Sequence, residues 1–358
     1  MSWFRRINFL AICLCFGVVV LGAFVRLSHA GLGCPDWPGC YGHLGVPLEA
    51  HDVAKAEQNF PQRPVEAHKA WKEMIHRYFA STLGLLIVAL AFMSLKLREQ
   101  GAPRVLPWAL VALVIFQGLL GMWTVTELLK PLIVTAHLIG GMSTLSLLVW
   151  LWLASGRTDT ATAEPARHRS ERQLAIELQR TPAQEGPKPL PLPPSKLRRY
   201  ALGALLLVCL QIFLGGWTST NYSALACPDL PTCHGQWLPE LDVPTAFTLW
   251  HGLGIDYEHG ILDARARVTI HFFHRVGAVA VTVALLLLGW FLWRRGEFPI
   301  WRGFGVAVVA ALALQVSIGL SIVKLQLPLG LATAHNAGAA ILLLTLVSLN
   351  FFAWKARR

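Results

Sequence analysis

The stretch LGAFVRLSHAGLGCPDWPGCYG, from Leu21 to Gly42, recurs later in the chain as LGGWTSTNYSALACPDLPTCHG, from Leu214 to Gly235. The two copies lie 193 positions apart and share the pattern Cys-Pro-Asp-x-Pro-x-Cys. A match of this length at one fixed offset indicates an internal duplication. The sequence therefore predicts two related halves.

The repeat continues downstream, where the offset between the copies becomes 198. At that offset His76 and Arg77 match His274 and Arg275. Further matches are Gln117 with Gln315, Gly121 with Gly319, and the Thr-Ala-His ending at His137 with the one ending at His335. Because the offset grows by five, we expect a five-residue insertion in the second copy, between the cysteine motif and the His-Arg pair.

The composition is typical of a protein embedded in a membrane. Of the 358 residues, 54% are hydrophobic and 14% are charged, and the mean hydropathy is +0.51. A helix needs about 20 apolar residues to cross a bilayer. We predict an all-α integral membrane protein with eight transmembrane helices at about 7–25, 72–95, 105–125, 131–154, 200–219, 268–293, 303–323 and 329–353.

The net charge of +11 suggests a nucleic-acid partner at first, but the distribution of the basic residues argues against one. With the N-terminus in the cytoplasm, 20 of the 31 Lys and Arg residues fall in cytoplasmic segments, as expected for membrane proteins. This pattern predicts cytoplasmic N- and C-termini, outer loops at 26–71 and 220–267, and no nucleic-acid partner.

The first segment also resembles a signal peptide, because arginines precede an apolar run and Ser-His-Ala at 28–30 resembles a cleavage site. Its counterpart in the second half argues that the segment is retained as a helix of the fold.

Each half contains four predicted helices, so the chain returns to its starting side after each half. The halves then share one orientation, as two tandem four-helix bundles related by a pseudo-two-fold axis along the membrane normal. We divide the chain into an N-terminal half (1–155), a cytoplasmic linker (156–198) and a C-terminal half (199–358). The linker is polar, basic and rich in proline, which predicts a flexible connection.

Four of the 13 histidines lie within predicted spans and recur in both halves, namely His76, His137, His274 and His335. All four lie on spans that run from the outer to the inner side. Each lies about six residues past the predicted helix start, or roughly 9 Å at 1.5 Å per residue. We therefore expect the four imidazoles at one depth, near the outer surface.

A lone histidine in a membrane helix is often a packing residue bonded to a neighbouring helix. Four that match in repeat and depth favour a ligand role, and imidazole binds metals and haem iron. Zinc usually takes three or four protein ligands. Two histidines per half, facing each other across a bundle, favour a haem between them.

Two arginines, Arg77 and Arg275, directly follow histidines of this set. Guanidinium pairs with carboxylate in bidentate form, and haem carries two propionates. We predict that these arginines bind the propionates; the alternative is an arginine that extends toward lipid headgroups.

With its His-Arg pairs, Thr-Ala-His pairs, Cys-Pro-Asp loops and four-plus-four organisation, the chain resembles the haem A synthase family. The resemblance covers the chain except for the linker and rests on the motifs in combination. It implies an eight-helix oxidoreductase that oxidises the C8 methyl of haem O to the formyl of haem A by successive hydroxylations. Haem A then serves cytochrome oxidase.

The resemblance also implies roles for individual residues. His274 and His335 are expected to bind a permanent haem b as cofactor. His76 and His137 are expected to bind the haem O substrate. The acidic residue of the family, three positions before the first histidine, corresponds to Glu73. The cysteine pairs of its outer loops correspond to Cys34/Cys40 and Cys227/Cys233.

A comparison of the halves supports this division independently, because the counterpart of Glu73 is His271. Glu73 lies almost one helical turn from His76, on the same face. We expect its carboxylate to accept a proton, or to stabilise positive charge, at the oxidised methyl group. The alternative is an ordinary carboxylate near a helix start. For His271 the sequence leaves open a contact with haem b or an interfacial position.

Of the seven cysteines, Cys13, Cys15 and Cys209 lie within spans and are predicted to be packing residues. The other four form two pairs in the outer loops, which face the oxidising environment outside the bacterial cytoplasm. We predict the disulfides Cys34–Cys40 and Cys227–Cys233, with a structural role ahead of a redox role. A zinc site with His43 or His234 is a weaker alternative.

Two other functions compete with this prediction. A b-type membrane cytochrome with two haems, working in quinol-linked electron transfer, would have equivalent sites in both halves, and the Glu73/His271 difference argues against it. A transporter also fits parallel repeats, but the predicted spans are unbroken and their polar groups lie toward the outer side.

For partners, the sequence predicts membrane lipids around the bundle and, by pathway logic, a haem O synthase as the source of substrate. The electron donor or acceptor is unknown, and a homo-oligomer is compatible with the sequence. The expected location is the bacterial cytoplasmic (inner) membrane.

Overall fold

The computed structural model describes residues 2–97, 99, 102–156, 196–252, 254–295 and 298–355. Within these ranges the chain is helical apart from its loops, which contain the isolated bridges Cys40–His43 and Cys233–Gln236. Eight helices are long and apolar enough to cross a membrane. They are α1 (Ser2–Leu27), α3 (Ala67–Lys96), α4 (Val105–Thr126), α5 (Pro131–Ser155), α7 (Leu197–Thr220), α9 (Ala264–Arg295), α10 (Pro299–Lys324) and α11 (Leu329–Lys355).

These helices confirm the eight predicted spans. The expected spacing from helix start to histidine holds for α5 and α11, but it is wrong for α3 and α9. His76 lies nine residues after Ala67, and His274 lies ten residues after Ala264. Both helices begin in polar segments with good helix formers, so they extend beyond the apolar run that hydropathy detects.

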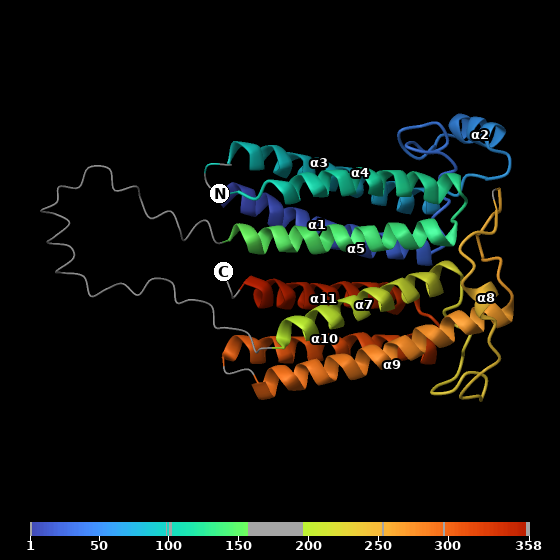
Figure 1. Ribbon diagram of the computed structural model, residues 1–358. Coiled ribbons are helices and arrows are strands. Elements are labelled where there is room, and N and C mark those ends of the chain that lie inside the picture. Colours follow the sequence, from blue (N-terminus) through green and yellow to red (C-terminus); the bar gives the residue numbers. More distant parts are fainter. Residues whose placement is uncertain are drawn as a thin grey trace, which may run out of the picture.

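The helices pack as two rings of four, one from each half. In the first ring the contacts run from α1 to α3, α4, α5 and back to α1, and in the second from α7 to α9, α10, α11 and back to α7. Figure 1 shows the two groups side by side, with α1 and α5 facing α7 and α11. This arrangement is compatible with the predicted pseudo-two-fold axis. Of the predicted linker, residues 157–195 lie outside the described residues.

The outer loops project from one end of the bundle, opposite the end where α1 begins and α11 ends (Figure 1). They contain two short helices that the sequence did not predict, α2 (Ala50–Asn59) and α8 (Val243–Ala246). Each loop has a small apolar core of its own. The loops therefore form a structured cap over the outer ends of the spans.

The cysteine motif folds into the same turn in both loops. The carboxylate of Asp36 accepts hydrogen bonds from the backbone N–H groups of Tyr41 and Gly42, and Asp229 does so for the corresponding His234 and Gly235. The glycine of each turn has a positive φ, of 79° and 74°, a conformation that glycine adopts without strain. The Thr232 hydroxyl and these N–H groups hold the pKa of Asp229 well below its usual range.

Long side chains connect the two halves at the outer end. The Arg26 guanidinium, on α1, donates to the backbone oxygens of Ser219 and Thr220 at the end of α7 and lies over the Tyr222 ring. A cation is favourable at the C-terminal end of a helix. Lys130, 2% exposed, lies over the Trp250 ring of the other half. These contacts fix the two rings against each other.

Candidate haem-binding site

The four histidines occupy equivalent places in the two rings. His76 lies on α3 and His137 on α5, which are diagonal to each other across the first ring. His274 on α9 and His335 on α11 are placed in the same way in the second. Each bundle thus carries two buried imidazoles on diagonal helices, and their binding of haem stays a prediction.

Each of these imidazoles faces a glycine on a neighbouring helix. A Cβ built on Gly22 would lie 2.9 Å from Cε1 of His76, and one on Gly215 would lie 3.2 Å from that of His274. For His137 and His335 the glycines are Gly121 at 3.6 Å and Gly319 at 3.0 Å. Both glycine pairs match in the repeat. A side chain at most of these positions would displace the ring, so the glycines set where the imidazoles lie.

Three of the four imidazoles have a nitrogen without a protein partner. Within the described part of the chain, Nδ1 of His76, His137 and His335 is buried and makes no hydrogen bond. Buried polar groups are nearly always hydrogen-bonded, so a recurring exception needs an explanation. Of these three rings, His335 also has its Nε2 3.3 Å from the amide Nε2 of Gln315. Rings that are buried and paired in this way fit the ligation of haem iron from two sides.

Glu73 is 5% exposed and is held between the outer loop and α3. Its Oε2 accepts a hydrogen bond of 2.9 Å from the backbone N–H of Cys34, and its Oε1 accepts one of 2.5 Å from the Arg77 guanidinium. The carboxylate therefore has a fixed position one turn from His76. Each oxygen keeps a second lone pair for another donor.

His271 makes the corresponding contact in the second half. Its Nδ1 accepts a hydrogen bond of 3.1 Å from the backbone N–H of Cys227, the counterpart of Cys34. The Arg275 guanidinium donates toward Nε2 of the same ring, with its Nε atom 3.3 Å away. A neutral imidazole accepts through one nitrogen only, so these two contacts alternate. The second half thus has the same contact without an ion pair.

Both arginines of the His-Arg pairs bind the outer loops. Arg77 donates to the backbone oxygens of Asp36 and Gly39. Arg275 donates to those of Asp229, Thr232 and Cys227. Binding of propionates by these arginines stays a prediction, and the contacts in this structure are with loop carbonyls.

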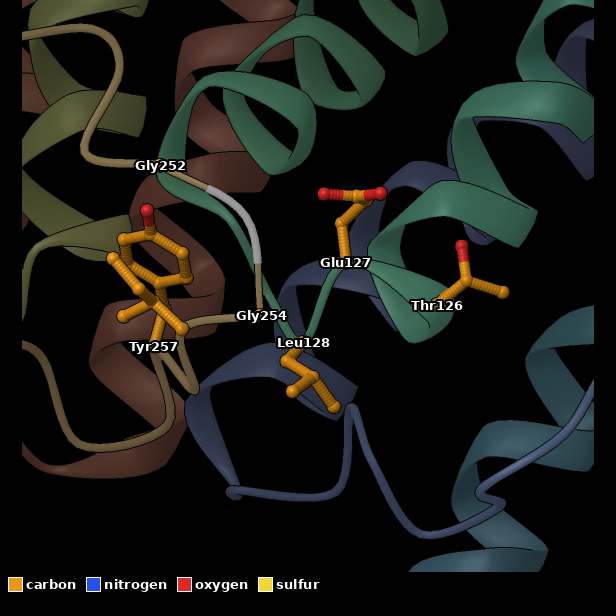
Figure 2. A pocket seen from close by; sticks show the side chains of 7 residues that line it. Thr126, Glu127, Leu128, Gly252, Gly254 and Tyr257 are labelled. Carbon is orange, nitrogen blue, oxygen red and sulfur yellow. The ribbon is translucent and has the colours of Figure 1, made fainter.

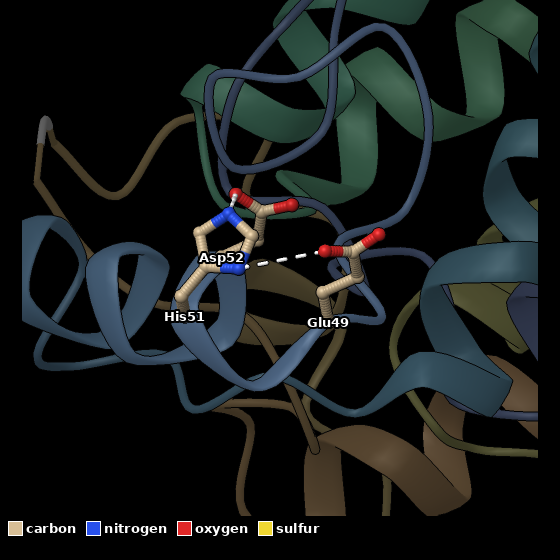
Figure 3. Close-up of side chains that lie close together, drawn as sticks. All are labelled: Glu49, His51 and Asp52. Carbon is tan, nitrogen blue, oxygen red and sulfur yellow. Dashed lines mark ion pairs between the residues drawn. The ribbon is translucent and has the colours of Figure 1, made fainter.

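The cysteine pairs of the loops are joined as disulfides, Cys34–Cys40 and Cys227–Cys233, and Cys13, Cys15 and Cys209 are free. Among the residues described, the one group of three metal-ligating side chains within reach of each other lies elsewhere. It consists of Glu49, His51 and Asp52 near the start of α2, where His51 forms exposed ion pairs with both carboxylates (Figure 3). Exposed pairs of this kind contribute little to stability.

Two cavities of about 210 Å³ each lie among the outer loops. One is lined by Glu127, Leu128, Gly252 and Tyr257 among others, where the turn after α4 meets the second outer loop (Figure 2). The other lies between the two loops, beside His29, Arg63 and His259. Neither lining contains the four histidines, so both cavities belong to the cap.

Sequence reasoning missed the glycines that face the histidines and the contacts of Arg26 and Lys130 between the halves. The glycines had a signal, because Gly22 and Gly121 recur at the repeat offsets as Gly215 and Gly319. Arg26 had none, because its repeat counterpart is Ser219.

Comparison with known proteins agrees with this architecture. Residues 5–347 match the COX15-CtaA family, described as cytochrome oxidase assembly protein. A Heme A synthase of Shewanella oneidensis is 44% identical over 99% of this chain and 97% of its own length. Those of Caulobacter vibrioides and Halalkalibacterium halodurans are 28% and 26% identical over 98% and 92% of this chain, and over 95% and 90% of their own lengths. The chain therefore belongs to the COX15-CtaA family of cytochrome oxidase assembly proteins.

Proposed function

We propose that this protein is a haem A synthase, a membrane oxidoreductase that converts the C8 methyl of haem O into the formyl of haem A by successive hydroxylations. The observation on which this proposal depends is the pair of buried imidazoles in each bundle, each set against a glycine of a neighbouring helix. Similarity to proteins named Heme A synthase over nearly the whole chain supports the same activity.

The two halves divide the work. His76 and His137 bind the substrate haem O in the N-terminal half, and His274 and His335 bind a resident haem b in the C-terminal half. The Glu73/His271 difference supports this assignment, because a carboxylate beside the substrate can take part in chemistry. A site that only passes electrons needs ligands and insulation.

The resident haem b, when bound, supplies a one-electron redox centre within the membrane. The chain supplies a positioned base. Glu73 is fixed by the Cys34 N–H and the Arg77 guanidinium, and it accepts the proton that water releases when it attacks the oxidised methyl group. Each hydroxylation removes two electrons, which an external electron acceptor takes up. The same carboxylate stabilises positive charge that develops there. After the second hydroxylation the carbon carries two hydroxyl groups and loses water to give the formyl group.

The charge distribution and the fold support a setting for the reaction. The protein spans the bacterial cytoplasmic membrane with both termini in the cytoplasm. The predicted cytoplasmic segments are rich in Lys and Arg, and α1 begins and α11 ends at the same end of the bundle. A haem O synthase supplies the substrate, and an electron partner remains to be identified.

The experiment is to purify the full chain with and without co-expression of a haem O-producing enzyme, and to identify the extracted haems by mass spectrometry. We expect haem b alone without haem O, and haem b, haem O and haem A with it. Haem b alone under both conditions would support a b-type electron carrier instead, and absence of any haem would contradict the sites.

A further inference from the structure

Gln211, on α7, contacts one of the four histidines in two places. Its amide Nε2 lies 3.0 Å from Nδ1 of His274 and donates a 2.9 Å hydrogen bond to the backbone oxygen of the same residue. One amide therefore touches both the ring and the backbone of His274. Two contacts of this kind restrict the rotation of the imidazole about its side-chain bonds.

The amide fits because the facing residue on α9 is a glycine. A Cβ built on Gly277 would lie 2.2 Å from Oε1 of Gln211, a distance that real side chains do not tolerate. Any other residue at 277 would force Gln211 away from His274. Gln211 and Gly277 thus form one packing unit.

The N-terminal half lacks this unit. The repeat offsets place Val18 where the second half has Gln211, and Phe79 where it has Gly277. Consistent with this, Nδ1 of His76 is buried without a partner in the part of the chain that the structure describes.

A glutamine accompanies the other histidine in both halves. Nε2 of Gln315 lies 3.3 Å from Nε2 of His335, whereas Nε2 of Gln117 is buried without a partner among the described residues. Gln117 is packed against Gly140 and Gln315 against Gly338, so that a Cβ on either glycine would overlap the amide. The two pairs match at the repeat offset of 198. A glutamine packed against a glycine therefore accompanies the second histidine in both halves, and the first histidine only in the C-terminal half.

We propose that Gln211 is a positioning residue that locks His274 as an iron ligand, so that the C-terminal site retains its haem while the unlocked His76 lets the N-terminal site exchange haem. This inference rests on the proposed division between a resident haem b and a haem O substrate. A site that receives substrate and releases product needs exchange, whereas a resident cofactor needs retention.

The physical basis is the second nitrogen of a ligating imidazole. When Nε2 binds iron, Nδ1–H donates to an acceptor that fixes the ring and raises its basicity. An amide can present its oxygen to that hydrogen. Turning the amide oxygen to Nδ1 gives up the bond to the backbone oxygen of His274, which keeps its partner within the helix. Losing such an acceptor typically lowers metal affinity roughly 10–100-fold.

The test measures haem loss from the full chain loaded with haem b and haem O. Excess apomyoglobin captures released haem, and mass spectrometry distinguishes the two haems, so each site is followed separately. Gln211→Met should release haem b roughly 10–100-fold faster and raise its midpoint potential, with haem O loss unchanged. Gln211→Glu, which keeps an acceptor, should retain haem b. Leu210→Ala, on the exposed side of α7, is the control.

The reciprocal variant Val18→Gln with Phe79→Gly builds the unit into the first half. This variant should lose haem O more slowly than the wild type. The measurement tests the proposal even if Gln211→Met does not fold. Haem b loss and potential at wild-type values in Gln211→Met, or unchanged haem O loss in the reciprocal variant, would overturn the proposal. Haem A formation tests the proposed function separately, because a chain without the lock can still convert haem O.

Discussion

The two outer loops are fastened to the bundle by matching contacts that differ in charge. In the first half Glu73 accepts the N–H of Cys34 and pairs with Arg77. In the second half His271 accepts the N–H of Cys227, and the contact with Arg275 involves a neutral imidazole. In both halves the arginine also donates to loop carbonyls.

The difference between Glu73 and His271 separates two roles of this position, the anchoring of the loop and a part in the chemistry. His271 shows that a neutral side chain is sufficient to anchor a loop of this kind. Anchoring alone therefore does not account for a carboxylate at position 73, where a buried charge carries a desolvation cost. The charge at Glu73 is the feature that the proposed chemistry uses, and the following changes test the comparison.

The largest effects are expected from the histidines. His76→Ala or His137→Ala should abolish haem A formation and leave haem b bound, because only the substrate site is lost. His274→Ala or His335→Ala should remove haem b, and haem A with it. Extracted haems quantified by mass spectrometry check both outcomes. His68→Ala, an exposed change on the same helix as His76, should behave as wild type; loss of haem b in His76→Ala would contradict the division.

The arginines should differ in their effect on stability. Arg77→Gln leaves the buried carboxylate of Glu73 without its cation, which typically costs about 3–5 kcal/mol. Arg275→Gln leaves a neutral imidazole and unpaired carbonyls, at about 1–3 kcal/mol. Thermal unfolding in detergent should therefore rank Arg77→Gln as the less stable variant.

Adding Glu73→Gln to Arg77→Gln should recover part of that loss, because the unpaired charge is removed. Equal losses for both arginine variants, with no recovery in the double variant, would show that the ion pair contributes nothing beyond the loop contacts.

The disulfides should act on different halves. Replacing both cysteines of either pair with serine should cost roughly 2–3 kcal/mol by loop-closure entropy. Loss of Cys34–Cys40 should also lower haem A formation, because the N–H of Cys34 positions Glu73. Loss of Cys227–Cys233 should weaken haem b retention and, with it, haem A formation. Product yield and haem b content are measured on both variants, and a fall in haem b content on loss of Cys34–Cys40 would contradict the comparison.

The smallest effect concerns acid pH. The pKa of Asp229 is lowered by hydrogen bonds from Thr232 and the loop backbone. A lowered pKa in the folded state gives stability that is present above the unfolded value of roughly 3.9 and is lost as the pH falls below it. Hydrogen exchange in the second outer loop should be constant from pH 7 to 5, after correction for intrinsic rates, and should rise below pH 4. Asp229→Asn should show faster exchange already at pH 7.

The sequence predicted the eight spans and which of them carry the four histidines, because apolar length and repeat offsets can be read directly from the sequence. The distance from helix start to histidine was wrong for α3 and α9, whose polar first turns hydropathy does not detect. It predicted an arginine–propionate contact that the structure leaves untested, since Arg77 and Arg275 bind loop carbonyls here. Each arginine reaches these carbonyls because the cysteine motif of the loop folds back over the helix that carries the arginine. The sequence pattern does not specify where the backbone oxygens of that turn lie. The fit of Gln211 against Gly277 likewise depends on which helices become neighbours.

The most direct test of the account is the variant Glu73→His, which gives the first half the side chain of the second. The imidazole can still accept the Cys34 N–H, so the loop and both haem sites should remain. Extracted haems should then contain haem b and haem O, with haem A formed roughly 10²–10⁴-fold more slowly, the range for loss of a general base. Haem A formation at the wild-type rate in this variant would contradict a chemical role for Glu73.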